Sequence, residues 1–102
     1  MFERHFDMTV FTYFSDANEA VLTTSFVLNK TDQITRVYHH LEDGMWEFIS
    51  DRAVEESDYK VISMVEILNI DEELLTLSDM EPGFFAYRKE PNGTFEIKPS
   101  IL

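Results

Sequence analysis

The sequence contains no cysteine, which excludes disulfide bridges, thiolate metal sites and thiol-based catalysis. Its three glycines cannot build a phosphate-cradling loop, and no serine stands in a Gly-x-Ser-x-Gly elbow. No apolar run reaches the roughly 18 residues that a membrane helix needs. The first residues lack the basic stretch and apolar run of a secretory signal. We therefore expect a cytoplasmic protein that does not bind membranes.

Basic residues are also scarce, with 8 Lys and Arg against 20 Asp and Glu and a formal net charge of −12. Residues 1–41 carry five acids and three bases, 42–81 carry thirteen and two, and 82–102 carry two and three, giving −2, −11 and +1. This middle segment predicts a negative field that attracts a basic partner and repels nucleic acid. The alternative interpretation is that the acidity only keeps the protein soluble.

Apolar residues make up 44% of the 102 residues, and nine phenylalanines make the expected core bulky. We expect one domain over residues 1–102, able to fold without a cofactor.

Several segments have the composition of β-strands. Residues 6–14 alternate with period 2, and residues 21–29 are β-branched and aromatic. Residues 34–50 predict a β-hairpin that turns at Glu42-Asp43-Gly44, and a second hairpin is predicted from Phe84 to Ile97. Val61-Ile62 adds a short strand.

Helix signals cluster between two of these strands. Ser63 and Glu66 have the spacing of a capping box, so a short helix is expected to begin at Ser63. Asn69 is expected to end this helix in a left-handed conformation, and Asp71 to cap a second helical turn through Leu77. The order of elements predicts an α+β fold, with a mainly antiparallel sheet of about five to six strands and one or two short helices on one face.

Catalytic and metal-binding constellations are not evident. His39 and His40 are adjacent in a predicted strand and so point to opposite faces, and His5 is far away in sequence. Acidic stretches lack the alternating spacing and central glycine of a calcium loop. We expect no metal, no cofactor and no enzymatic activity.

Trp46 lies two residues before Phe48, on the same face of the predicted hairpin. Two interpretations stay open: both side chains belong to the core, or Trp46 is a partly exposed anchor for a partner, a role in which tryptophan is enriched.

Four segments resemble the bacterial immunity-protein family type thirty-three, formerly a domain of unknown function, over roughly residues 25–97. They are Ser25-Phe26-Val27-Leu28, the Gly-x-Trp-x-Phe strand within Asp43–Ser50, the segment Val65–Asp71, and Pro82-Gly83 before an aromatic strand. The resemblance implies an antidote that neutralises a cognate toxin by tight association inside the producing cell.

The charge distribution is consistent with a basic toxin as the partner, met by acidic side chains of the middle segment. The expected partner-binding residues are Asp43, Trp46, Glu55, Glu56, Asp58, Glu72, Glu73 and Asp79. Trp46 is included under the second interpretation, in which it is a partly exposed anchor. The competing hypothesis is a housekeeping or regulatory interaction module, with a homodimer as one form, that pairs through an edge strand or an apolar patch.

Overall fold

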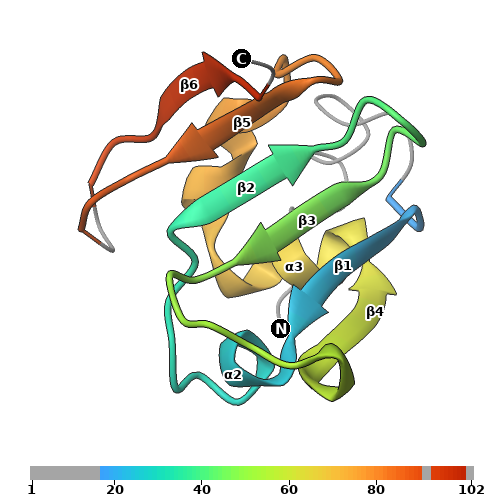
Figure 1. Cartoon of the computed structure of the whole chain (residues 1–102), viewed down its shortest axis with the longest axis vertical. Coiled ribbons are helices and arrows are strands. Elements are labelled where there is room, and N and C mark those ends of the chain that lie inside the picture. Colours follow the sequence, from blue (N-terminus) through green and yellow to red (C-terminus); the bar gives the residue numbers. More distant parts are fainter. Residues whose placement is uncertain (1–16, 91–92, 101–102) are drawn as a thin grey trace.

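The computed structural model describes residues 17–90 and 93–100 and is built on one six-stranded sheet in the order β4-β1-β3-β2-β5-β6 (Figure 1). The strands are β1 (Ala20–Thr24), β2 (Arg36–His39), β3 (Trp46–Ile49), β4 (Tyr59–Ser63), β5 (Phe84–Tyr87) and β6 (Glu96–Pro99). Neighbours pair antiparallel except β1 and β3, which are parallel. The predicted α+β class with a mainly antiparallel sheet is confirmed.

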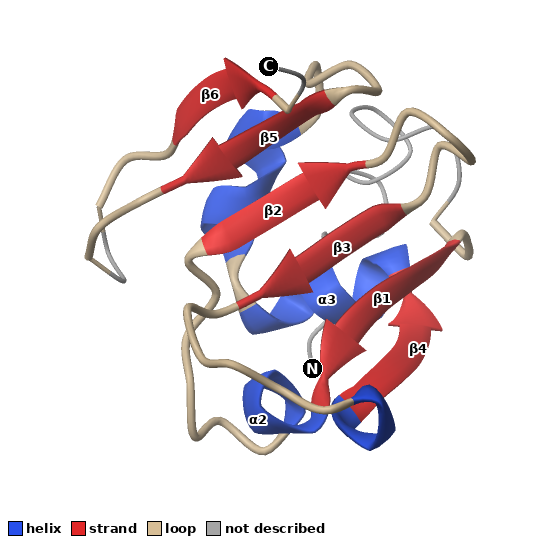
Figure 2. Ribbon diagram, in the orientation of Figure 1, coloured by secondary structure: helices blue, strands red, loops and turns tan. Residues whose placement is uncertain are grey.

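The helical segments are short: α2 (Ser25–Leu28), α3 (Met64–Ile70) and two 3₁₀ segments, η1 (Glu56–Asp58) and η2 (Glu72–Leu77). Figure 2 shows α3 behind the sheet, while the opposite face is turned to the viewer with none of the described helices across it. The core lies between α3, η2 and the rear face of the sheet. Its fully buried side chains include Val21, Val37, Phe48 and Ala86 from strands and Met64, Ile67, Leu68 and Leu74 from helical segments.

The predicted strand over 21–29 is right for its first half and wrong for its second. β1 ends at Thr24, whose side chain accepts a hydrogen bond from the Val27 N–H at 3.3 Å and so caps α2. The Asn29 N–H then bonds the Ser25 carbonyl at 2.9 Å. This cap gives the β-branched and aromatic segment a helical turn.

Both predicted hairpins are present. In the first, Val37 pairs with Phe48, and Gly44 adopts a left-handed φ of 72° in the turn. In the second, Ala86 of β5 pairs with Ile97 of β6, while residues 91–92 of its turn lie outside the described residues. The strand predicted over 6–14 also lies outside them.

The capping box at Ser63 is confirmed: the Ser63 Oγ accepts from the Glu66 N–H, and the Glu66 carboxylate accepts from the Ser63 N–H at 2.8 Å. The prediction that Asn69 ends the helix is wrong, because α3 continues through Ile70 to a C-cap at Asp71 with φ −150°. Asp71 also caps η2, as predicted, by accepting from the Glu73 N–H at 3.0 Å.

The strand directions define two ends of the sheet. His39, Trp46, Ser63 and Phe84 lie at one, here called the His39 end, because His39 pairs with both Trp46 and Phe84 and β4 finishes where β1 begins. The Arg36 end carries Thr24, Arg36, Ile49, Tyr59 and Tyr87. None of the described helices is long and apolar enough to cross a membrane.

Candidate protein-binding surface

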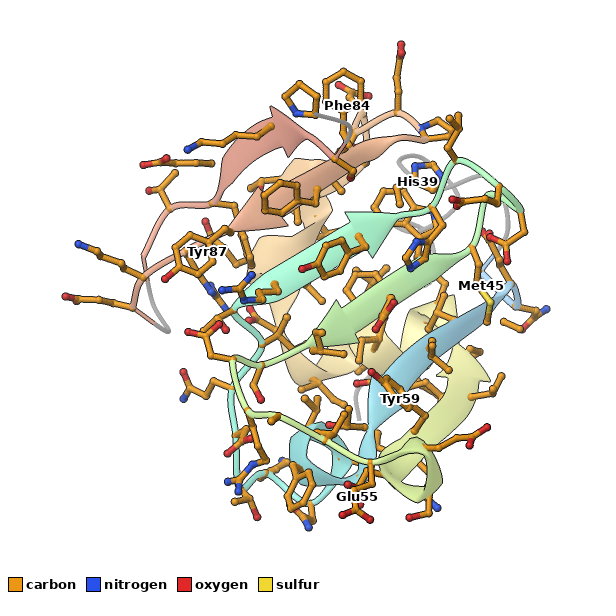
Figure 3. The ribbon with its side chains drawn as sticks, viewed as in Figure 1. His39, Met45, Glu55, Tyr59, Phe84 and Tyr87 are labelled. Atoms are coloured by element: carbon orange, nitrogen blue, oxygen red, sulfur yellow. The ribbon has the colours of Figure 1, made fainter. Side chains whose placement is uncertain are left out.

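The eight residues predicted to bind a partner do not form one patch. Asp43 lies in the β2–β3 turn at the His39 end, and Asp79 directly precedes Met80, whose carbonyl lies 2.7 Å from His39 Nδ1. Glu55, Glu56 and Asp58 instead precede β4 at the Arg36 end. Figure 3 shows the same division, with His39, Met45 and Phe84 at one end and Glu55 at the other.

Two loops are tied together at the His39 end. The Gly83 N–H donates to the His39 carbonyl at 2.7 Å, and a Cβ placed on Gly83 would lie 3.7 Å from the Leu41 side chain. Gly83 has φ +92°, a backbone conformation that favours glycine, whereas the space beside Leu41 would admit a Cβ. The hydrogen bond between Gly83 and His39 brings the two loops together. They carry four exposed carboxylates, which we call the acidic end: Glu42, Asp43, Asp79 and Glu81.

No lysine or arginine occurs in residues 37–51 or 61–87, the two segments that supply the acidic end. The carboxylates of this end therefore act without cations from their own loops. Sequence analysis included Asp43 and Asp79 but missed Glu42 and Glu81, although all four lie in the acidic middle segment.

Cations accompany the acids at the Arg36 end. Arg52 binds Asp32 through two nitrogens, at 2.7 and 2.8 Å, and this bond lowers the pKa of Asp32. The hydrogen bond to Asp32 also raises the pKa of Arg52, and the negative charge of Asp58 raises it further. Lys60 is exposed in the adjoining strand. This end consequently presents both signs of charge.

Glu72 and Glu73 also lie toward the Arg36 end, on the helical side of the sheet. They open η2 directly after Asp71, which forms an ion pair with Arg88 beyond the end of β5. Both glutamates are exposed, and they complement the positive N-terminus of the segment. The structure brings them together with neither Asp43 nor Asp79.

Trp46 belongs to the core, so its inclusion among the exposed partner-binding residues is corrected. Its side chain is 4% exposed and lies parallel to the His39 ring with centroids 4.0 Å apart. Phe48, on the same face, is fully buried, which matches the first interpretation given above. The sequence signal for this placement was Phe48, an apolar residue two positions later and therefore on the same face of the strand.

His39 and His40 point to opposite faces, as predicted. His39 faces the core beside Trp46, whereas His40 lies on the open face with its Nε2 2.7 Å from the Glu47 carboxylate. Across the described ranges 17–90 and 93–100, no group of three or more His, Cys, Asp and Glu side chains has a metal-binding arrangement.

The open face of the sheet carries a row of aromatic side chains that sequence analysis did not single out. Tyr38 stacks between His40 and Phe85, with ring centroids 5.8 and 5.5 Å away. The Arg36 guanidinium lies 4.9 Å from the centre of the Tyr87 ring. Tyr59 and Tyr87 are seen on this face in Figure 3. The imperfect alternation of 34–41, apolar on both parities, was the available signal.

Burial and neighbouring charges shift the pKa values of Tyr59 and Asp51. Burial, followed by the negative charge of Glu47, raises the pKa of Tyr59 above 10.0. A hydrogen bond from Arg36 at 2.8 Å lowers the pKa of Asp51. Arg36 is therefore paired with Asp51 in an ion pair.

A hollow of about 260 Å³ joins the open face to the acidic end. It is lined by Tyr38, His40, Leu41, Glu42, Gly83 and Ser100. The Ser100 N–H donates to the Gly83 carbonyl at 2.8 Å, which holds the end of β6 against the rim. Leu41 is 58% exposed, a large value for a leucine. Aromatic, apolar and acidic groups therefore meet at one place.

In comparisons with known proteins, no family model, no curated protein and no solved structure matches this chain. The resemblance to an immunity-protein family stays a prediction.

Proposed function

We propose that this chain is an immunity-type binding protein that neutralises a cognate basic toxin by associating with it through the acidic end. The observation that carries the proposal is the 2.7 Å hydrogen bond from the Gly83 N–H to the His39 carbonyl, which joins two loops that carry four exposed carboxylates and no lysine or arginine. A surface of one sign speeds encounter with a surface of the other sign and disfavours partners of the same sign.

The two groups of acids differ in what they offer a partner. At the Arg36 end, Arg52 and Lys60 offset the carboxylates that precede β4, so the local field is weaker. At the acidic end, the carboxylates come from turns that are fixed by backbone hydrogen bonds of 2.7–3.2 Å. A partner would meet them with little loss of loop freedom, which favours affinity.

The test begins with capture of binding proteins from source cells at low salt, followed by kinetics with the purified basic partner. The variant E42K/D79K/E81K reverses three charges at the acidic end, and E56K/E72K/E73K reverses three at the Arg36 end. Each changes the net charge from −12 to −6, because three substitutions each add two units.

We expect the acidic-end variant to lower the association rate about tenfold or more at low salt, and the matched variant to lower it much less. Both should approach the wild-type rate as salt is added. Equal effects of the two variants would show that only net charge matters and would refute the proposal.

A second candidate function rests on the edge strands. Val61 of β4 is 62% exposed and Ile97 of β6 is 49% exposed, so each edge presents an apolar residue that could take part in self-association. Lys60 and Lys98 adjoin them and oppose such pairing. A sedimentation mass that rises with concentration, together with no basic partner, would favour this homodimeric module.

A further inference from the structure

We propose that the hollow beside the acidic end receives a single arginine side chain of the basic partner. This inference rests on the proposed function, since it assumes that a basic protein approaches this end. It specifies the recognising group and the residues that contact it.

The size of the hollow limits its occupant. Its 260 Å³ lies below the roughly 300–1,000 Å³ of pockets that hold drug-sized ligands, so one side chain is an appropriate occupant. Leu41, with 58% of its surface exposed, offers apolar area to the aliphatic part of a long side chain.

The lining suits a planar cation. Tyr38 is already stacked between His40 and Phe85, so the ring offered to a ligand is that of His40, whose side chain keeps 37% of its surface exposed. A guanidinium stacks on such rings and binds carboxylates through two N–H groups, whereas an ammonium has no flat face.

The carboxylate that lines the hollow is Glu42. Glu47, on the neighbouring strand, is already engaged by His40 at 2.7 Å. No lysine or arginine lines the hollow. Asp43 follows Glu42 in the chain and Glu81 lies two residues before Gly83, so both add negative charge near it. Lys98 lies on the same face opposite Phe85, so its charge opposes a cation, and the acids of the rim outnumber it.

The test uses N-acetyl-arginine amide as the probe, with the neutral isostere N-acetyl-citrulline amide as the control, and backbone amide NMR of the whole chain. We expect shifts at residues 38–42, 83 and 100 that saturate in the millimolar range, as befits so small a ligand. The citrulline probe should bind at least about fivefold more weakly, because it lacks the charge-assisted hydrogen bonds.

Two matched variants locate the binding. Glu42→Gln should weaken arginine binding about fivefold, whereas Glu73→Gln, which removes an exposed carboxylate at the other end, should leave it unchanged. Equal binding of the citrulline probe, shifts spread over both ends, or no shifts would each overturn the inference.

These outcomes are separate from the fate of the proposed function. If the arginine probe does not bind, the assignment of the hollow as an arginine site is refuted. The proposed function is then still tested by the association kinetics of the charge-reversal variants. Insensitivity of the captured partner to E42K/D79K/E81K refutes the proposed function whatever the probe does, and with it the claim that the bound arginine belongs to that partner.

Discussion

Replacing Arg88 with methionine should destabilise the protein more than any surface substitution. The guanidinium is 2% exposed, donates to the Ile34 carbonyl from Nε at 2.9 Å and from Nη2 at 2.7 Å, and forms an ion pair with Asp71. It also lies 4.3 Å from the centre of the Phe95 ring. Arg88 thereby joins the end of β5 to the start of β2 and to the junction of α3 and η2.

The magnitude follows from what Arg88→Met leaves behind. Removing one partner of a buried ion pair typically costs about 3–5 kcal/mol, because the other charge stays desolvated. The Asp71 side chain keeps 23% of its surface exposed, so water can solvate it partly and the lower part of that range applies. A loss of about 3 kcal/mol corresponds to a fall in Tm of about 12–24 °C for a chain of this size.

The assay is urea unfolding followed by the fluorescence of Trp46, the one tryptophan of the chain and a buried one. Lys89→Met is the matched control, since the neighbouring Lys89 is exposed and its loss should change the free energy of unfolding by less than about 0.5 kcal/mol. Asp71→Asn keeps a capping oxygen for η2 and removes the charge, so combining it with Arg88→Met should recover part of the loss. A loss below about 1 kcal/mol for Arg88→Met would refute the reasoning.

Two further predictions concern the capping box and the open face. Ser63→Ala removes the acceptor for the Glu66 N–H and should lower the free energy of unfolding by about 1 kcal/mol, as measured by urea unfolding. Ser57→Ala is the control at an exposed serine, and equal effects of the two substitutions would count against the cap. Tyr59 has a raised pKa in the folded state, so its contribution is complete below pH 10.0 and is lost as pH rises through the folded value. Tyr59→Phe should therefore lose less stability than the wild type on going above pH 10.0, and parallel losses would contradict the assignment.

Local signals explain why much of the fold could be predicted. The hairpin over 34–50 and the cap at Ser63 depend on residues close in sequence, and both are present. The parallel pairing of β1 with β3 joins Leu22 to Glu47, across two intervening elements, and no local pattern encodes it. Arg88 likewise reads as a surface residue in sequence, because its acceptor Ile34 is 54 positions away.

The candidate site could be predicted only in part for the same reason, because residues close in sequence were assumed to form one charged surface. The acidic segment 42–81 is continuous in sequence, but between Asp43 and Glu55 the chain runs the length of β3 and so passes from one end of the sheet to the other. Four strand residues span about 13 Å. Exposed charges are screened over about 8 Å at physiological ionic strength. The two groups of carboxylates therefore act as separate surfaces, and a basic partner bound at the His39 end gains little from Glu55, Glu56 and Asp58.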